Sequence, residues 1–449
     1  MNDLVELAGS VNQAAEKIDK VQLTVCMGRV ASVVGTGVEV AGLHPPPPVG
    51  HRLLVVSQEP ESSRAEIVGA SGGRLLASLH GAAQGIAPGQ PVRVLDAATL
   101  SPDRSWLGRV IDPTGRPMDG LGPLRDGPRA RAIRAAPPQA GQRARLGPRL
   151  DLGVRALDIF ATCRRGQRLG LFAASGVGKS TLMSMLARGA DTEVTVICLV
   201  GERGRELREF IEDDLGPEGL RRAVVVCATS DASPLMRRDA ALAAMTVAEH
   251  FRDEGQQVLL LMDSVTRFAM ALREIGLAAG EPPTTKGYPP SVFAELPRLL
   301  ERAGTAAEGA GGGAITGLFT VLVEGDDHDE PVADAVRGIL DGHVVLDRAI
   351  GEGGRYPAVD VLRSLSRTSP GCLLPEERPI LLRARRILAL FRDMADLVRL
   401  GAYRAGTDPA VDEAVRLAPR IEAVLTQRKD EREGVAEAFR QLAIALEAA

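Results

Sequence analysis

The spacing of hydrophobic residues changes several times along this chain, and each change predicts a different kind of structure. In residues 1–20, Leu4, Leu7, Val11 and Ile18 recur at helical spacing with polar residues between them, which predicts an amphipathic helix. A helix that precedes the first folded domain either docks a partner or folds back on its own domain. The sequence favours neither of these two roles.

Residues 21–97 carry short β-branched runs that Gly and Pro interrupt, a pattern that predicts a small antiparallel barrel. Small barrels that bind single-stranded nucleic acid stack the bases on aromatic side chains beside a basic groove. The first Phe, Tyr or Trp of the chain is Trp106, which lies beyond the barrel. A helicase-like function is therefore disfavoured. The strand candidates are residues 23–25, 38–40, 53–56, 65–68 and 92–94.

The centre of the chain alternates apolar strand-like runs with helical stretches. Residues 101–153, which precede this region, are rich in Arg, Pro and Gly. This composition predicts an extended connection that packs along the next domain, with its arginines on a solvated face. From Val154 to Gly371 the alternation predicts an α/β core with a parallel sheet. Its strand candidates are residues 169–173, 194–200, 223–227, 258–262 and 315–323.

Turn signals become rare after Leu374, and three stretches carry helical periodicity, at 380–403, 411–427 and 431–447. Asp408 followed by Pro409 is typical of an N-cap and the first residue of a helix. This region predicts a helical bundle. The chain then has four parts, at residues 1–20, 21–97, 98–373 and 374–449.

Charge and cysteine content narrow the choice of partner and compartment. The chain has 54 Lys and Arg against 58 Asp and Glu, a formal net charge of −4. Its overall charge therefore gives no electrostatic attraction to nucleic acid or to a membrane surface. The five cysteines form no C-x-x-C pair, which suits a reducing cytosol. The chain starts without a signal-peptide pattern and has no apolar run long enough to span a bilayer. Any membrane association is therefore expected to be indirect.

The most informative stretch is residues 169–181, an apolar strand, a turn of small residues and the start of a helix. It matches G-x-x-x-x-G-K-[ST] except that Ala173 replaces the first Gly. Backbone N–H groups in such a turn converge on phosphate oxygens at a helix N-terminus. Lys179 would reach the β- and γ-phosphates of a nucleoside triphosphate, and the Ser180 hydroxyl would bind Mg²⁺. The binding loop comprises Ala174, Ser175, Gly176, Val177, Gly178, Lys179, Ser180 and Thr181.

Two further apolar runs end in a carboxylate. Residues 258–262 lead into Asp263, which would hold Mg²⁺ through water beside the phosphate loop. Residues 194–200 lead into Gly201 and Glu202, and Glu202 is the candidate base that polarises the attacking water. A surface Glu paired with Arg203 or Arg205 would give the same local pattern.

Residues 356–367, YPAVDVLRSLSR, resemble the signature of the α/β subunits of rotary ATP synthases and their relatives. Together with residues 201–203, 263–269 and 287–293, they most closely resemble the type III secretion ATPases. Within that group, residues 281–283 and 325–331 are similar to the flagellum-specific export ATPase. The resemblance extends from Val21 to Gln427, nearly the whole chain.

The resemblance implies a RecA-like core and assigns roles to individual residues. Lys179, Ser180, Glu202 and Asp263 match the phosphate-loop lysine, the magnesium-bound hydroxyl, the catalytic glutamate and the second-motif aspartate. Tyr356 matches the residue that stacks on adenine.

Arg367 matches the arginine finger that a neighbouring subunit inserts into the site, and Arg363 is its nearby rival. Arg203 and Arg267 match arginines near the γ-phosphate, although either could be part of a structural ion pair. Relatives often carry Gly at Ala174, so this loop is expected to be slightly stiffer. The Ala- and Gly-rich residues 303–313 resemble a mobile loop that faces a central pore.

The implied function is ATP hydrolysis, with Mg²⁺, by a homohexamer at the cytoplasmic base of a type III export apparatus, most plausibly the flagellar one. Expected partners are a stator-like regulator at the N-terminal helix, a central-stalk-like protein, the export gate, and substrates with their chaperones. The protein would be cytoplasmic and peripheral at the inner face of the cytoplasmic membrane, with no nucleic-acid partner. The alternatives are a virulence injectisome ATPase, a catalytic subunit of a rotary proton-translocating synthase, a non-hydrolysing structural subunit and a hexameric RNA translocase.

Overall fold

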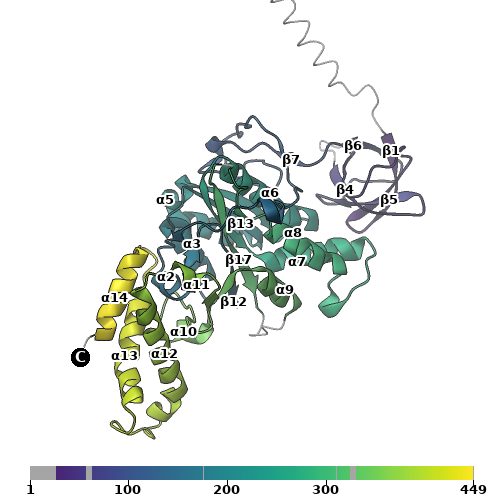
Figure 1. Ribbon diagram of the computed structural model, residues 1–449. Coiled ribbons are helices and arrows are strands. Elements are labelled where there is room, and N and C mark those ends of the chain that lie inside the picture. The colour runs from purple at the N-terminus through teal and green to yellow at the C-terminus, as the bar shows by residue number, and fades with distance from the viewer. Residues whose placement is uncertain (1–26, 57–62, 175, 310, 324–329, 448–449) are drawn as a thin grey trace, which may run out of the picture. The chain divides into compact units, whose positions relative to one another are not determined.

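The computed structural model describes residues 27–56, 63–174, 176–309, 311–323 and 330–447 (Figure 1). The predicted helix at 1–20, the strand candidate at 23–25, Ser175 and nearly all of segment 325–331 lie outside these residues. The described chain divides into two compact units, with the boundary between Ala97 and Ala98.

The first unit is a closed antiparallel barrel with the strand order β1-β2-β5-β4-β3-β6, in which β6 pairs back to β1. Its interior is aliphatic, with Val38, Leu53, Ile67 and Leu79 fully buried. The sequence did not predict β1 and β5, because Gly, Ser and Arg dilute their apolar pattern. The strands are β1 (Met27–Val34), β2 (Gly37–Ala41), β3 (Arg52–Val55), β4 (Ser63–Ser71), β5 (Arg74–Leu79) and β6 (Pro91–Leu95).

The second unit contains a largely parallel sheet, which confirms the predicted α/β core. In the described residues its order is β19-β18-β12-β17-β15-β13-β14-β8, with β16 paired to β17. Only β19 and β16 run antiparallel to their neighbours. The strands are β8 (Val110–Ile111), β12 (Arg168–Ala173), β13 (Val194–Glu202), β14 (Ala223–Thr229), β15 (Gln257–Asp263), β16 (Gly304–Thr305), β17 (Ala314–Leu322), β18 (Gly342–Val345) and β19 (Leu365–Ser366).

Helices cover both faces of this sheet, so its central strands are apolar on both sides. In β13, Ile197 and Leu199 face one core and Val196 and Cys198 face the other. Figure 1 shows α3 on one side of the strands and α6 to α9 on the other. The helices are α2 (Arg155–Phe160), α3 (Lys179–Gly189), α4 (Gly204–Glu209), η3 (Phe210–Leu215), α5 (Gly216–Arg221), α6 (Pro234–Asp253), α7 (Val265–Ala278), η4 (Thr285–Gly287), α8 (Pro290–Leu300), α9 (Pro331–Ile339), α10 (Arg348–Glu352) and α11 (Ser369–Cys372).

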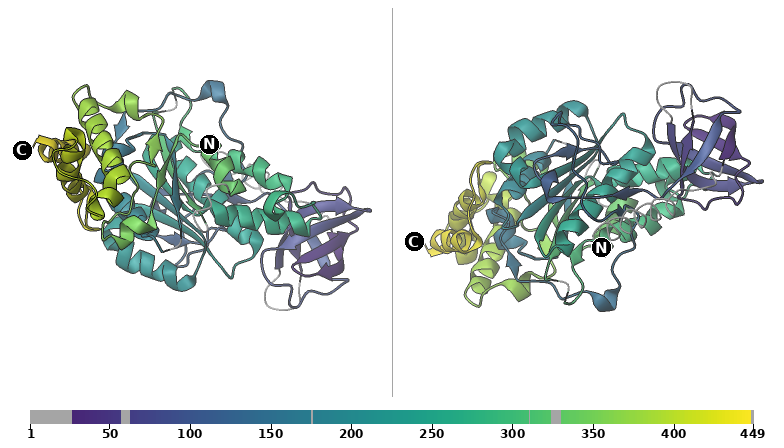
Figure 2. Two further views of the ribbon diagram at one scale, coloured as in Figure 1. Left: turned by 90° about the horizontal axis from the view of Figure 1, so that it is seen from below. Right: turned by 90° about the horizontal axis from the view of Figure 1, so that it is seen from above.

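Three helices complete the chain, α12 (Glu377–Arg399), α13 (Pro409–Leu425) and α14 (Val435–Glu447). They pack together beside the layer that contains the parallel sheet, as the yellow-green helices of Figure 2 show. The Asp408 side chain accepts a hydrogen bond from the Ala410 N–H, and Pro409 is the first residue of α13. The predicted cap is therefore confirmed. No helix in the described part of the chain is both long and apolar enough to cross a bilayer.

Residues 101–153, which were predicted to form an extended connection along the next domain, also contribute a strand to the sheet. Their strand β8 pairs with β14 and becomes the last strand of the sheet, while β7 (Thr99–Leu100) pairs with β9 (Arg131–Ala132). The prediction of solvated arginines is wrong for three residues. Arg109 pairs with Asp119, Arg143 with Glu301 and Arg149 with Glu377, and each of these guanidinium groups is largely buried. The shorter elements here are η1 (Arg104–Trp106), η2 (Ala140–Gln142), β10 (Arg149–Leu150) and β11 (Cys163–Arg164).

The Gly-rich stretch at 303–313 is anchored at its two ends. Its first residues form β16, and the Ala306 N–H donates to the Gly313 carbonyl, which closes a hairpin with β17. A Cβ on Gly313 would lie 1.9 Å from the Arg252 carbonyl oxygen, so this position packs tightly on α6. These contacts hold the two ends of the stretch, and the mobility of the loop between them stays a prediction. Whether it faces a pore stays a prediction.

Candidate functional site

The phosphate-binding loop follows β12 and leads directly into α3. Gly178 caps the helix at φ +89°, a left-handed conformation that favours glycine. A Cβ at this position would also lie 3.5 Å from the Tyr356 ring. Ala173, which replaces the first Gly of the motif, is the last residue of β12, and its methyl group is buried in the core. The loop therefore needs no glycine there, because that residue is ordinary extended strand.

Four side chains meet at the carboxyl ends of four successive strands. The sheet order β12-β17-β15-β13 brings together Lys179 after β12, Thr320 in β17, Asp263 at the end of β15 and Glu202 at the end of β13. Ligand sites of open parallel sheets lie outside this edge of the strands. The predicted order of loop, aspartate and glutamate thus gives one compact site. Thr320 was missed because a single Thr within an apolar strand has no distinctive sequence pattern.

Asp263 is the most buried charge of the site, with its side chain 4% exposed. Its Oδ1 lies 2.6 Å from the Lys179 ammonium nitrogen and accepts a hydrogen bond of 2.7 Å from the Thr320 hydroxyl. Lys179 also lies 3.7 Å from Glu202 Oε1. The lysine is therefore held between the two carboxylates that were predicted to act on magnesium and on water.

Glu202 lies in an environment that suits a general base. Burial raises the pKa of Glu202 to about 7, the Asp263 and Glu206 carboxyls add to the rise, and Lys179 opposes it. A base with a pKa near the working pH transfers protons efficiently. Glu202 and Asp263 line one pocket of about 140 Å³ together with Ser180.

The donor set of this pocket fits Mg²⁺. Magnesium in triphosphate sites keeps several waters and binds one or two carboxylates together with the phosphates. Asp263 and the Ser180 hydroxyl supply oxygen ligands of this type on one wall of the pocket. A magnesium ion held there would neutralise charge on the β- and γ-phosphates.

Tyr356 lies beside the phosphate loop and is half exposed, so its side chain is accessible to a ligand. Its backbone is fixed from the C-terminal helical region, since the Gln427 N–H donates to the Tyr356 carbonyl at 2.8 Å. The buried Arg355 donates to the carbonyls of Pro357 and Val359 and pairs with Glu422 of α13 at 2.5 Å. Arg355 and Gln427 were not predicted, because their roles depend on contacts between distant segments.

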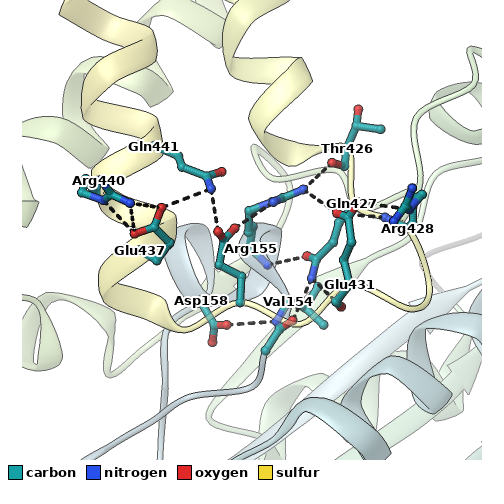
Figure 3. A network of polar contacts seen from close by, with 12 residues as sticks. Val154, Arg155, Asp158, Thr426, Gln427, Arg428, Glu431, Glu437, Arg440 and Gln441 are labelled. Carbon is teal, nitrogen blue, oxygen red and sulfur yellow. Dashed lines mark hydrogen bonds and ion pairs between the residues drawn. The ribbon is translucent and has the colours of Figure 1, made fainter.

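The same C-terminal region is tied to the core through Arg155 of α2 (Figure 3). Its guanidinium pairs with Glu433 at 2.7 Å and with Glu431 at 3.2 Å. Its backbone N–H donates to the Gln427 side chain, which in turn donates to the Gly153 carbonyl. Gln427 thus bridges the start of the core and the Tyr356 loop.

The two arginines predicted near the γ-phosphate differ in their surroundings. Arg203 is 80% exposed and pairs with Glu206 at 3.1 Å, so it has the contact of a surface ion pair. The stem of Arg267 packs against Gly201, where a Cβ would lie 3.5 Å from Arg267 Cδ. Its buried Nε has no hydrogen-bond partner within the described part of the chain. Arg267 is therefore better placed to bind a ligand than Arg203.

Arg367 lies far from its own phosphate loop. Its backbone N–H donates to the Asp341 carbonyl, and the Asp341 N–H donates to the carbonyl of Arg168, the first residue of β12. The loop starts at Ala174, after β12. The length of β12, about 20 Å, therefore separates the Arg367 backbone from the phosphate loop. The Arg367 side chain is exposed and forms no ion pair with any residue that the structure describes. Arg363, its rival, pairs with Asp347 at 3.5 Å, beyond the other end of β18.

Comparisons with known proteins agree with this geometry. Residues 153–366 match the ATP synthase alpha/beta family nucleotide-binding domain, and residues 374–443 match the T3SS EscN ATPase C-terminal domain. A "Flagellum-specific ATP synthase" of Caulobacter vibrioides is 53% identical over 437 residues, covering 96% of this chain and 98% of that protein. A "Type 3 secretion system ATPase" of Xanthomonas euvesicatoria is 46% identical, covering 90% of each chain. The chain belongs to the flagellum-specific and type III secretion ATPases.

A solved structure of this ATPase family has the same fold. It is the assembled ATPase EscN of enteropathogenic E. coli in complex with its central stalk EscO, at 37% identity and a TM-score of 0.85. The match covers 93% of this chain and 100% of that chain. The protein is thus a type III export ATPase, with the barrel, the nucleotide-binding sheet and the C-terminal helices of its family.

Proposed function

We propose that this ATPase works as a homohexameric ring that energises type III export, with each active site shared between two subunits. The observation that carries the proposal is the position of Arg367 at the opposite end of β12 from its own phosphate loop. An arginine there reaches a bound triphosphate only on a neighbouring copy. The solved structure of EscN is that of an assembled ATPase, which supports an assembly of several copies here.

In the proposed mechanism the chain's own residues bind and orient ATP. Lys179 and the loop N–H groups hold the β- and γ-phosphates, Tyr356 stacks on adenine, and Ser180 and Asp263 hold Mg²⁺. Glu202 accepts a proton from the water that attacks the γ-phosphate in line. Arg267 of the same subunit and Arg367 of the next stabilise the charge of the transition state. Fingers of this type contribute roughly 10³ to 10⁵ in rate.

Complementation between two inactive variants tests the shared site. Lys179→Ala removes the phosphate contact and Arg367→Ala removes the finger, so each variant alone should be nearly inactive. A mixture should regain activity, because an Arg367→Ala subunit keeps an intact loop and a Lys179→Ala neighbour can lend its finger. A mixture as inactive as its components would overturn the shared site. Single protomers at high dilution should likewise be nearly inactive.

We also propose that the export apparatus is flagellar and that the protein is cytoplasmic and peripheral at the inner membrane face. The 53% identity with the flagellum-specific relative over nearly the whole chain supports this choice. Deletion of the gene should abolish flagellar assembly and motility. Intact motility with loss of secreted virulence proteins would instead indicate an injectisome.

The partners of this machine follow from the same proposal. A central-stalk-like protein is expected in the ring, as the EscN complex with its stalk suggests. A stator-like regulator is expected at residues 1–20, and the export gate, substrates and chaperones are expected nearby. Affinity capture with the full chain should recover the regulator, whereas a chain that begins at Val21 should not. Equal recovery by both chains would exclude the docking role of the N-terminal segment.

A further inference from the structure

Gln167 is a fully buried amide that immediately precedes β12. Its Nε2 donates to the Ser366 hydroxyl at 2.9 Å and to the Asp341 carbonyl at 3.2 Å. Its Oε1 accepts from the Thr368 hydroxyl at 2.6 Å and from the Arg164 N–H at 2.9 Å. An amide side chain has two donors and two acceptor lone pairs, so every one of its hydrogen-bonding positions is used.

These contacts surround one residue, Arg367. Ser366 and Thr368 are its two chain neighbours, and the Asp341 carbonyl that Gln167 binds also accepts the Arg367 backbone N–H at 3.0 Å. The Ser366 hydroxyl donates in turn to the Thr162 carbonyl at 2.7 Å. The backbone of Arg367 is therefore fixed on both sides, while its side chain remains exposed.

Among the described residues, the Gln167 side chain forms no hydrogen bond with the nucleotide site of its own subunit. It lies at the amino end of β12, whereas the phosphate loop follows the carboxyl end of the same strand. A buried amide in an otherwise apolar interior is costly unless all its hydrogen bonds are made. Here two of the four are made with Ser366 and Thr368 on either side of the finger, and a third with the Asp341 carbonyl that also binds the finger's backbone.

We propose that Gln167 is the positioning residue for the arginine finger Arg367. This inference rests on the proposed role of Arg367 at a neighbouring site. Gln167 fixes the finger's backbone, so that the guanidinium enters the next subunit's site at the correct depth. A misplacement of about 1 Å can lower the rate of an enzyme by roughly 10²-fold.

Gln167→Met keeps the approximate volume of the side chain and removes all four hydrogen bonds. The expected result is a kcat lower by about tenfold to a hundredfold, with a KM for ATP within about twofold of the wild-type value. A change in KM as large as the change in kcat would contradict the proposal, because a finger acts on the transition state. Gln257→Met is the matched control. Gln257 is the first residue of the parallel strand β15, and its amide donates to the Gly312 carbonyl rather than to a neighbour of Arg367.

Complementation separates a finger effect from a general structural effect. Gln167→Met is added either to the Lys179→Ala subunit, which lends the finger, or to the Arg367→Ala subunit, which receives it. On the finger-lending subunit it should lower the restored activity at least tenfold. On the receiving subunit it should change that activity less than about twofold. Equal losses on both sides, or no loss on either, would overturn the role of Gln167.

Two further outcomes keep the proposals distinguishable. If the Lys179→Ala and Arg367→Ala mixture restores no activity at all, the shared site itself is wrong, and the inference about Gln167 is wrong with it. If Gln167→Met does not fold, Thr368→Val replaces it, since it leaves Gln167 in place and removes one contact beside Arg367. Thr368→Val should give the same asymmetry between lending and receiving subunits with a smaller loss, and a symmetric effect would overturn the proposal.

Discussion

The Lys179 ammonium lies 2.6 Å from the Asp263 carboxylate, although Lys179 begins the helix that follows β12, Asp263 ends β15, and β17 runs between those two strands. The intervening strand contributes Thr320, whose hydroxyl donates to the same carboxylate oxygen that faces the lysine. Asp263 is thus oriented by two partners at once. Its remaining oxygen, Oδ2, is the one left for a ligand of the pocket.

Thr320→Val tests this orientation. It should raise the Mg²⁺ concentration for half-maximal activity by about tenfold, because partners that orient a metal ligand typically contribute 10- to 100-fold in affinity or activity. Thr195→Val is the matched control, since Thr195 is also a buried strand threonine but its hydroxyl has no hydrogen-bond partner in the described chain. ATPase rates over a Mg²⁺ titration provide the measurement. An unchanged titration for Thr320→Val would exclude its orienting role.

The pH dependence of kcat/KM should report the proton of Glu202. The pKa of Glu202 is raised to about 7, and a base acts only when deprotonated, so kcat/KM should fall about tenfold per pH unit below that value. Glu202→Gln should lose roughly 10² to 10⁴ in kcat while ATP binding persists. A flat profile between pH 5.5 and about 7 would contradict Glu202 as the base.

Glu206→Gln should move the acidic limb of that profile to lower pH. Glu206 raises the pKa of Glu202 both through its side-chain hydrogen bond and through its charge, and the substitution removes the charge. Glu209→Gln is the control, because Glu209 lines the same pocket and is likewise paired with an arginine, Arg205, but does not contribute to the raised pKa of Glu202. A shift of equal size in both variants would point to a general charge effect.

Arg355 and Tyr356 should affect nucleotide binding through one shared contact, the stacking of Tyr356 on the base. Arg355→Met removes the contacts to Pro357, Val359 and Glu422, which should raise the KM for ATP about tenfold with kcat within about threefold. Tyr356→Ala should have a similar effect, since stacking on a base contributes about 1–3 kcal/mol. The double variant should be less impaired than the sum of the two, as expected for residues that act through one contact. Additive free-energy changes in nucleotide-binding measurements would show that Arg355 does not act through Tyr356.

Arg155 should matter for stability rather than for the chemical step. Arg155→Met leaves the half-buried Glu433 and the Thr426 carbonyl without this donor, which should lower the free energy of unfolding by about 1–3 kcal/mol. Arg428→Ala is the surface control. Arg428 is 74% exposed where it pairs with Asp430, so the loss should be at most about 0.5 kcal/mol. Thermal unfolding of both variants provides the comparison, and equal shifts would contradict the role of Arg155.

Several parts of the fold could be predicted because their signals lie in contiguous residues. The phosphate loop, the strands that end at Glu202 and Asp263, and the Asp408 cap each depend on a short run of neighbours. The elements that the sequence did not predict do not depend on such a short run of neighbours. The strands β5 and β19 are too short or too mixed in composition to show a period, and each exists because a partner strand is present to pair with it.

The sequence by itself determined the chemistry that this ATPase can perform, since the residue types of the loop and of the strand ends are local and specific. Only the tertiary structure decided how those residues are oriented. Thr320 meets Asp263 across 57 residues of sequence, and Gln167 meets Ser366 across 199. Hydrogen bonds of this kind arise from strand order and from the direction in which each strand runs, which no local pattern encodes. The same two properties place Arg367 at the end of the sheet away from its own loop.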